Sequence, residues 1–228
     1  MTSTRFSGGI AAIRVLLMAS IVCLLFYAFR MYRLGEVVFS YLPWNLFLAW
    51  IPLLLMVVLV RLLRKQAWSN WPALLTTLAW LLFLPNSFYM VSDYIHLQEL
   101  TADRILYDVV LFTMFVATGL LLGYSSVFLF HMELLKRVNR YTAARIISAV
   151  LLLCSFAIYL GRDLRWNSWD VLFHPQGLLF DLSNQLLHPF AYGDMVSTVL
   201  LFFALTGGLY YVGWRLVSVA LQITPRKA

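Results

Sequence analysis

The stretch ILYDVVLFTMFVATGLLLGYSSVFLF, residues 105–130, decides the fold of this chain. Asp108 is its only charged residue, and apolar and polar positions do not alternate along it. A helix needs about 20 apolar residues to cross the hydrocarbon core of a membrane. Only helices and closed barrels satisfy their backbones in lipid, and a near-continuous apolar run favours a helix. Residues 105–130 therefore predict a transmembrane helix.

Five more stretches have the length and apolar character of transmembrane helices: about residues 10–29, 42–61, 71–91, 143–160 and 195–215. The 228-residue chain is 62% hydrophobic and 12% charged, whereas a soluble domain is about half apolar and about a quarter charged. We predict an all-α integral membrane protein, a six-transmembrane-helix bundle that forms a single domain over residues 1–228.

Basic residues predict which helix ends face the cytoplasm. Most of the 17 basic residues lie at the two termini and in the second and fourth loops, so both termini are expected to be cytoplasmic. Arg30 and Arg33 are exceptions on the outer side. Among the acidic residues Glu133 alone falls on the cytoplasmic side, so the other acids gather at an outer polar face. The net charge of +7 is explained by these loops, without a nucleic-acid partner.

The third predicted span ends in WLLFLPNSFYMVSDYIHL, residues 80–97. Pro85 lacks a backbone donor and clashes with the carbonyl four residues earlier, so it predicts a kink. Asp93 lies seven residues after Asn86, on the same helical face, and His96 follows three residues later. Two interpretations fit this pattern: a polar cap at the end of a kinked helix, or one wall of an outward-facing site.

A second polar cluster, GRDLRWNSWD at residues 161–170, follows the fifth predicted span. Its arginines, Arg162 and Arg165, either pair with nearby aspartates or hold a phosphate or carboxylate of a ligand. The long outer loop that follows repeats leucines at helical spacing. It predicts an amphipathic interfacial helix at about residues 175–188, which either caps the bundle or forms a lid.

Two glycine pairs predict close helix packing. Gly119 and Gly123 form a G-x-x-x-G pattern in the fourth span, which lets a neighbouring backbone approach. Gly207 and Gly208 are expected to do the same in the sixth span.

Three further polar features have structural interpretations. Arg104 and Asp108 are four residues apart and are expected to pair. Asn45 is either a polar contact between helices or part of the outer site. His131 and Glu133 are expected to form a solvated helix end.

The motifs P-N-x-x-Y at 85–89 and G-R-x-x-R-x-N-S-W-D at 161–170 resemble those of Domain of Unknown Function 1361, an uncharacterised family of bacterial membrane proteins. The resemblance covers most of the chain. It implies a bacterial polytopic membrane protein, hence a multi-pass protein of the plasma (inner) membrane, and it brings no reaction. The motif positions are Pro85, Asn86, Tyr89, Asp93, Arg162, Arg165, Asn167, Trp169 and Asp170.

The first functional hypothesis is an extracytoplasmic site that binds or transforms a lipid or lipid-linked anionic substrate. Acid–base or metal-assisted chemistry would come from Asp93, His96, Asp163 and Asp170. Substrate contacts would come from Arg162, Arg165, Asn86, Asn167, Tyr89 and Trp169. The alternatives are a small-solute or ion transporter and a structural or accessory membrane subunit. The sequence identifies no cofactor and no oligomeric state. A metal site is not identified either, because possible ligands such as Asp93 and His96 lack the spacing of a known metal-binding motif.

Overall fold

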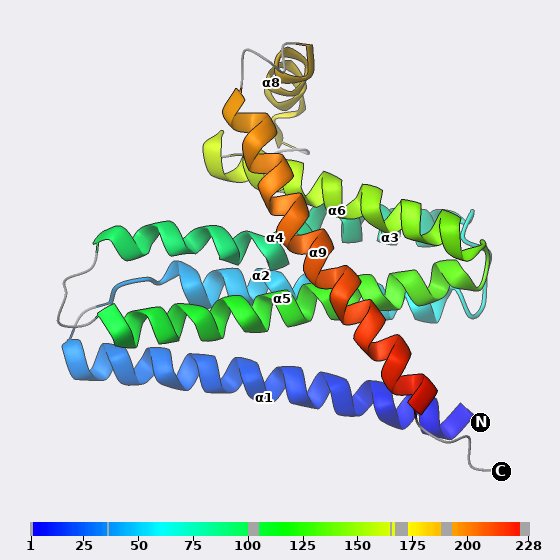
Figure 1. The fold of residues 1–228 in the computed structure, drawn as a ribbon, viewed down its shortest axis with the longest axis horizontal. Helices are drawn as coiled ribbons and strands as arrows, with labels where there is room; N and C mark the ends of the chain where they lie inside the picture. Colours follow the sequence, from blue (N-terminus) through cyan, green and yellow to red (C-terminus); the bar gives the residue numbers. More distant parts are fainter. Residues whose placement is uncertain are drawn as a thin grey trace. The chain divides into compact units, whose positions relative to one another are not determined.

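Six helices in the computed structural model of the chain are long and apolar enough to cross a membrane (Figure 1). The structure describes residues 2–35, 37–99, 105–164, 166, 173–187 and 193–223. The candidate spans are Ala11–Leu34, Tyr41–Leu62, Trp71–His96, Ile105–Leu135, Arg140–Asp163 and Asp194–Ala220. The predicted all-helical chain with six such helices is confirmed, and no strand occurs in the described ranges. The orientation of the termini stays a prediction.

The elements follow one another along the chain. They are α1 (Thr2–Leu34), α2 (Tyr41–Leu62), α3 (Trp71–Phe83), α4 (Pro85–Tyr89), the 3₁₀ helix η1 (Met90–Glu99), α5 (Ile105–Leu135), α6 (Arg140–Asp163), α8 (Pro175–Leu187) and α9 (Gly193–Ile223).

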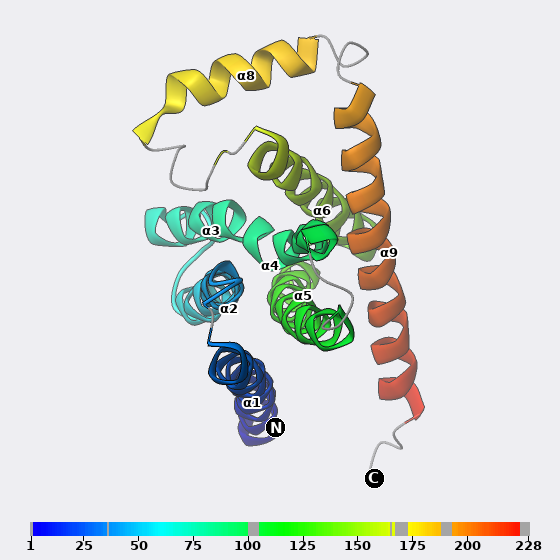
Figure 2. The same cartoon turned by 90° about the vertical axis from the view of Figure 1, so that its left-hand side faces the viewer.

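Packing divides these elements into two compact units, an N-terminal unit, Met1–Ser126, and a C-terminal unit, Val127–Ala228. Figure 2 views α1, α2 and α5 of the N-terminal unit nearly end-on, side by side. The core of this unit includes the fully buried side chains of Met56, Trp80 and Phe112. The expectation of a single domain stays a prediction.

The third span is interrupted at Pro85, as predicted. Helix α3 ends at Phe83 and α4 begins at Pro85, where the ring removes a donor and crowds the preceding turn. From Met90 onward the chain is a 3₁₀ helix, η1. In a 3₁₀ helix residues three apart lie on the same face, so the break also changes which side chains meet.

The close approach predicted at Gly119 and Gly123 is confirmed within the N-terminal unit. A Cβ on Gly123 would lie 2.8 Å from Cβ of Ser87, and one on Gly119 would lie 2.5 Å from Sδ of Met90. Only glycine allows the α4–η1 segment to lie this near α5. The Ser87 hydroxyl also donates to the Ala49 carbonyl at 3.1 Å, which ties α4 to α2.

Trp80 adds a polar link between three helices of the same unit. Its indole Nε1 donates to Oγ of Ser126 at 2.6 Å, and that hydroxyl donates to the Pro52 carbonyl at 3.2 Å. Such bonds satisfy buried polar groups where lipid offers none, and they fix the spacing of α2, α3 and α5.

In the C-terminal unit, α6 and α9 pack along one another. Helix α6 begins after Asn139, whose side-chain Oδ1 accepts from the Thr142 amide at 2.9 Å, an arrangement that satisfies one free donor of the first turn. Helix α8 occupies nearly the predicted loop-helix range. Its position at a membrane surface stays a prediction.

Two expectations for the C-terminal unit are wrong. His131 and Glu133 do not form a solvated end, because both residues are buried, each 5% exposed. Glu133 pairs with Lys136 and Arg137. The glycines of α9 do not make a close contact either: a Cβ on Gly208 would meet nothing within 4 Å.

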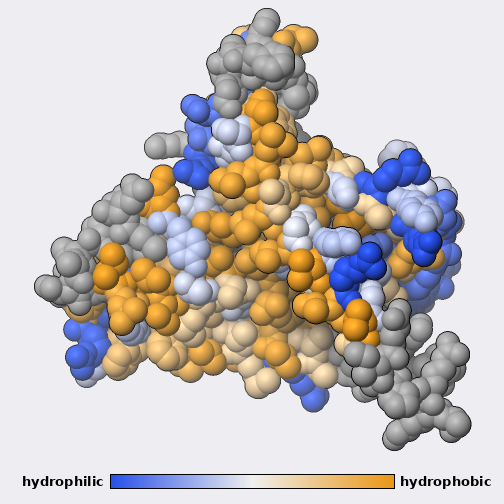
Figure 3. All heavy atoms as spheres, viewed as in Figure 1, coloured by the Kyte–Doolittle hydropathy of each residue, from blue (hydrophilic) through white to orange (hydrophobic). Residues whose placement is uncertain are grey.

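Large apolar side chains remain exposed on the long helices, among them Leu25, Leu75, Leu153 and Leu201. Most of the surface in Figure 3 that is not grey is hydrophobic, and hydrophilic residues collect near helix ends. Contiguous apolar surface of this extent is incompatible with water and fits a lipid environment.

Candidate functional site

Asp93 is buried in the N-terminal unit although it carries a carboxyl group. It lies in η1 and is 4% exposed. Nδ2 of Asn45, on α2, donates to Oδ2 of Asp93 at 2.9 Å. Among the described residues, no ion pair includes Asp93. A buried carboxyl group therefore receives a hydrogen bond from a neutral amide.

His96 joins Asp93 on one side of η1. The two residues are three positions apart, and the 3₁₀ form of the segment places them on one face. The His96 ring lies 4.9 Å, centroid to centroid, from the Tyr41 ring. Tyr41 and Asn45 are four apart on α2, which places them on one helical face. We call these four residues, Tyr41, Asn45, Asp93 and His96, the Asp93 cluster.

The two other candidate residues of the third span lie at the helix break. Nδ2 of Asn86 donates to the Phe83 carbonyl at 3.0 Å, so this side chain satisfies backbone next to Pro85. Tyr89 is half-buried, and its carbonyl accepts from the Ser92 hydroxyl at 2.7 Å. In this structure the described hydrogen bonds of Asn86 and Tyr89 support the α4–η1 backbone.

The candidate residues after the fifth span belong to the C-terminal unit. Arg162 and Asp163 are exposed at the end of α6. The indole Nε1 of Trp166 donates to Oδ2 of Asp181 on α8 at 3.0 Å. The candidates that lie outside the described residues are Arg165, Asn167, Trp169 and Asp170. The convergence of this cluster with Asp93 stays a prediction.

The described part of the chain contains no cluster of side chains of the kinds that bind metal ions. There, no group of three or more His, Cys, Asp or Glu side chains is arranged to hold an ion. The carboxyl group and the imidazole of the Asp93 cluster can form hydrogen bonds and transfer protons.

The sequence of this chain matches the model of a protein family. The family model described as "Protein of unknown function (DUF1361)" matches residues 44–207. The chain belongs to this family. No curated protein and no solved structure matches it. The DUF1361 match contains Asn45, Asp93, His96 and Arg162, and Tyr41 lies just before it.

One ion pair was missed by sequence reasoning: Arg30 of α1, which precedes the DUF1361 match, pairs with Asp108 of α5, which lies within it. The guanidinium donates through Nε to Oδ1 at 2.6 Å and through Nη2 to Oδ2 at 3.1 Å. The two side chains are 5% and 1% exposed. Asp108 was expected to pair with Arg104, which lies outside the described residues. Arg30 directly follows the first apolar run, and a buried charge needs a partner, but the sequence does not say which acid supplies it.

Aromatic rings connect the Arg30–Asp108 pair with the Asp93 cluster. The Arg30 guanidinium lies 4.7 Å from the centroid of the Phe39 ring. The ring centroids of Phe39 and Phe112 are 5.0 Å apart, and those of Phe112 and Tyr41 are 6.4 Å apart. Edge-to-face rings at such distances form a rigid apolar layer. These rings lie between the Arg30–Asp108 ion pair and the Asp93 carboxyl group, whose hydrogen-bond donor is the neutral Asn45 amide.

Proposed function

We propose that this DUF1361 protein binds a lipid or lipid-linked anionic substrate at the extracytoplasmic face of a bacterial plasma membrane. Asp93 and His96 act there as the acid–base pair. The observation that supports this most is the buried Asp93 carboxyl with the Asn45 amide as its hydrogen-bond donor.

The contrast between two buried aspartates supports a functional interpretation of Asp93. Asp108 receives two hydrogen bonds from Arg30 and is electrically compensated. Asp93 has no such partner among the described residues, although a carboxyl group in an apolar setting is unfavourable unless paired. An asparagine would make the same contact to Asn45 at lower desolvation cost. Ionisable groups inside membrane segments are for this reason functional candidates by default.

The substrate contacts of the proposal extend to the polar cluster after α6. Arg162 is exposed and takes part in no ion pair within the described chain. Its planar guanidinium, together with that of Arg165, suits a phosphate or carboxylate headgroup. Asn86, Tyr89, Asn167 and Trp169 complete the proposed contacts. Asp163 and Asp170 complete the acid–base or metal-binding groups.

Lipid retention by the purified full chain tests the proposal. Extraction and mass spectrometry of bound lipid should find an anionic lipid or lipid-linked species with the wild type. The double variant Arg162→Ala/Arg165→Ala should retain less of this species than the wild type, whereas Arg33→Ala, also an exposed arginine, should retain as much. If the double variant retains as much anionic lipid as the wild type, Arg162 and Arg165 do not bind the headgroup.

A second candidate, a small-solute or ion transporter, is favoured by one observation: the third span is broken at Pro85 and carries a buried carboxyl group beyond the break. Discontinuous helices and intramembrane carboxyl groups occur in transport proteins. The full chain in liposomes would then give a solute-dependent proton or ion current that Asp93→Asn abolishes. Absence of any such current, with lipid retention intact, favours the first proposal.

A further inference from the structure

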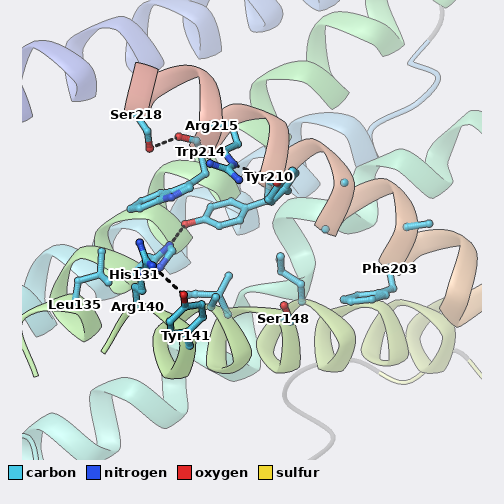
Figure 4. A pocket seen from close by; sticks show the side chains of 17 residues that line it. His131, Leu135, Arg140, Tyr141, Ser148, Phe203, Tyr210, Trp214, Arg215 and Ser218 are labelled. Atoms are coloured by element: carbon cyan, nitrogen blue, oxygen red, sulfur yellow. Dashed lines mark hydrogen bonds between the residues drawn. The ribbon is translucent and has the colours of Figure 1, made fainter. Parts of the chain in front are cut away.

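The C-terminal unit contains a groove that sequence reasoning did not anticipate. It has a volume of about 920 Å³ and lies between the last turns of α5, the first half of α6 and the middle of α9 (Figure 4). This volume is within the range of about 300–1,000 Å³ typical of ligand pockets. Its two long walls come from α6 and α9.

The two ends of the groove differ in chemistry. Figure 4 shows Arg140, Tyr141 and Arg215 at one end and Phe203 at the other. Between them the walls carry mostly apolar or small residues, such as Ile147 and Gly208. Gly208 of α9 lines this part of the groove, and a Cβ there would meet no atom within 4 Å.

The arginines at the polar end are not neutralised within the described chain. Nη2 of Arg140 donates to the Tyr141 hydroxyl at 2.8 Å, and Nε of Arg215 donates to the Tyr211 hydroxyl at 3.1 Å. Neither forms an ion pair with a described acidic residue. The nearby carboxylate of Glu133 is already bonded to Lys136 and Arg137. Two cations therefore remain available at one mouth of an apolar groove.

Aromatic side chains line the groove near this mouth. The His131 and Trp214 rings are stacked, with centroids 4.0 Å apart. Nδ1 of His131 is hydrogen-bonded to the Tyr210 hydroxyl at 2.9 Å. Tyrosine and tryptophan side chains with one apolar and one polar end favour the depth at which lipid headgroups meet acyl chains.

We propose that this groove is a binding site for an anionic phospholipid, with the phosphate at Arg140 and Arg215 and an acyl chain along Gly208 toward Phe203. The groove lies on helices apolar and long enough to cross a membrane, and it complements the lipid, with a cationic end for the phosphate and a long apolar part for an acyl chain. Arginine forks bind phosphate oxygens. This site shares no residue with the site proposed above and does not depend on it.

Titration of the detergent-purified full chain with phosphatidylglycerol, followed by native mass spectrometry, tests the headgroup contact. Each of Arg140→Gln and Arg215→Gln should weaken binding about fivefold, the effect of one basic side chain near an anionic surface. Arg145→Gln is the matched control, because Arg145 is exposed on α6 but does not line the groove. Phosphatidylcholine with the same acyl chains should bind less tightly.

The acyl-chain contact is tested on α9. Gly208→Leu should remove the phosphatidylglycerol bound in the groove, since Gly208 lines the groove and a larger side chain there enters open space. Gly213→Leu should leave binding unchanged, because a Cβ there also meets nothing within 4 Å and Gly213 does not line the groove. Thermal unfolding of both variants checks that they are folded.

Three results would overturn the proposal: wild-type binding by the arginine variants, wild-type binding by Gly208→Leu, or equal affinity for phosphatidylcholine. A change of oligomeric state in Gly208→Leu, with no change in lipid binding, would show that a second copy occupies the groove. Asp93→Asn should not alter phosphatidylglycerol binding at this groove, so the two proposals fail separately.

Discussion

The Asn45 amide on α2 donates to the Asp93 carboxyl in η1 at 2.9 Å, and the carboxyl is nearly inaccessible to solvent. This bond joins the segment beyond the Pro85 break to the second span. It therefore has a structural consequence that is independent of any substrate.

Two substitutions at Asp93 separate structure from function. Asp93→Ala leaves the Asn45 donor without its acceptor and should destabilise the fold by about 1–3 kcal/mol. Asp93→Asn keeps the shape and an acceptor oxygen, so its apparent melting temperature should stay close to that of the wild type while substrate turnover or transport is lost. The melting temperatures are measured in detergent. If both variants unfold at the wild-type temperature and both keep function, Asp93 neither links η1 to α2 nor acts as an acid–base group.

The Arg30–Asp108 pair should behave as a buried ion pair. Arg30→Met alone leaves the Asp108 carboxylate uncompensated and should cost about 3–5 kcal/mol of folding free energy. Arg30→Met combined with Asp108→Leu should recover much of that loss, since apolar replacements of a buried pair are tolerated. Arg33→Met, at an exposed position of the same helix, provides the baseline. Additive losses in the double variant would show that the two side chains do not interact.

Gly123 should not accept even one methyl group. A Cβ at this position would lie 2.8 Å from Cβ of Ser87, so Gly123→Ala forces α4 and α5 apart at a cost of about 1–3 kcal/mol. Gly213→Ala, which meets open space, should be neutral or slightly stabilising because alanine favours a helix. Thermal unfolding of the two variants compares them directly; equal melting temperatures would mean that α4 and α5 are not in close contact.

The sequence predicts the helices well because the membrane fixes their length. The apolar run at 105–130 predicts a helix, and Pro85 predicts a break. The structure contains both, as α5 and as the boundary between α3 and α4. The partner of Asp108 was not predictable, since Arg30 is 78 positions away and Arg104 is close in sequence. Both glycine pairs were expected to allow close helix packing, and their outcomes differ: a Cβ on Gly123 would lie 2.8 Å from Cβ of Ser87, whereas Gly208 lines a groove. That difference depends on which helix lies opposite, and one sequence does not specify it.

The predicted orientation is open to a labelling experiment in whole cells. Both native cysteines, Cys23 and Cys154, are buried, so the background should be low. Ser69→Cys, in the turn between α2 and α3, should resist a membrane-impermeant thiol reagent, because that loop carries basic residues and is expected to be cytoplasmic. Ser183→Cys on α8 should react. The reverse pattern would invert the topology and place the Asp93 cluster at the cytoplasmic face.

We propose that the Asp93 cluster is a site for a lipid or lipid-linked anionic substrate. The most direct measurement is photocrosslinking from Ile95, which is 45% exposed and adjacent to His96, with a benzophenone amino acid at that position. The same probe at Ile13, a comparably exposed position on α1, reports the surrounding bulk lipid. We expect one enriched anionic species crosslinked at Ile95, and its loss in Arg162→Ala/Arg165→Ala. Identical lipid profiles from Ile95 and Ile13 would contradict it.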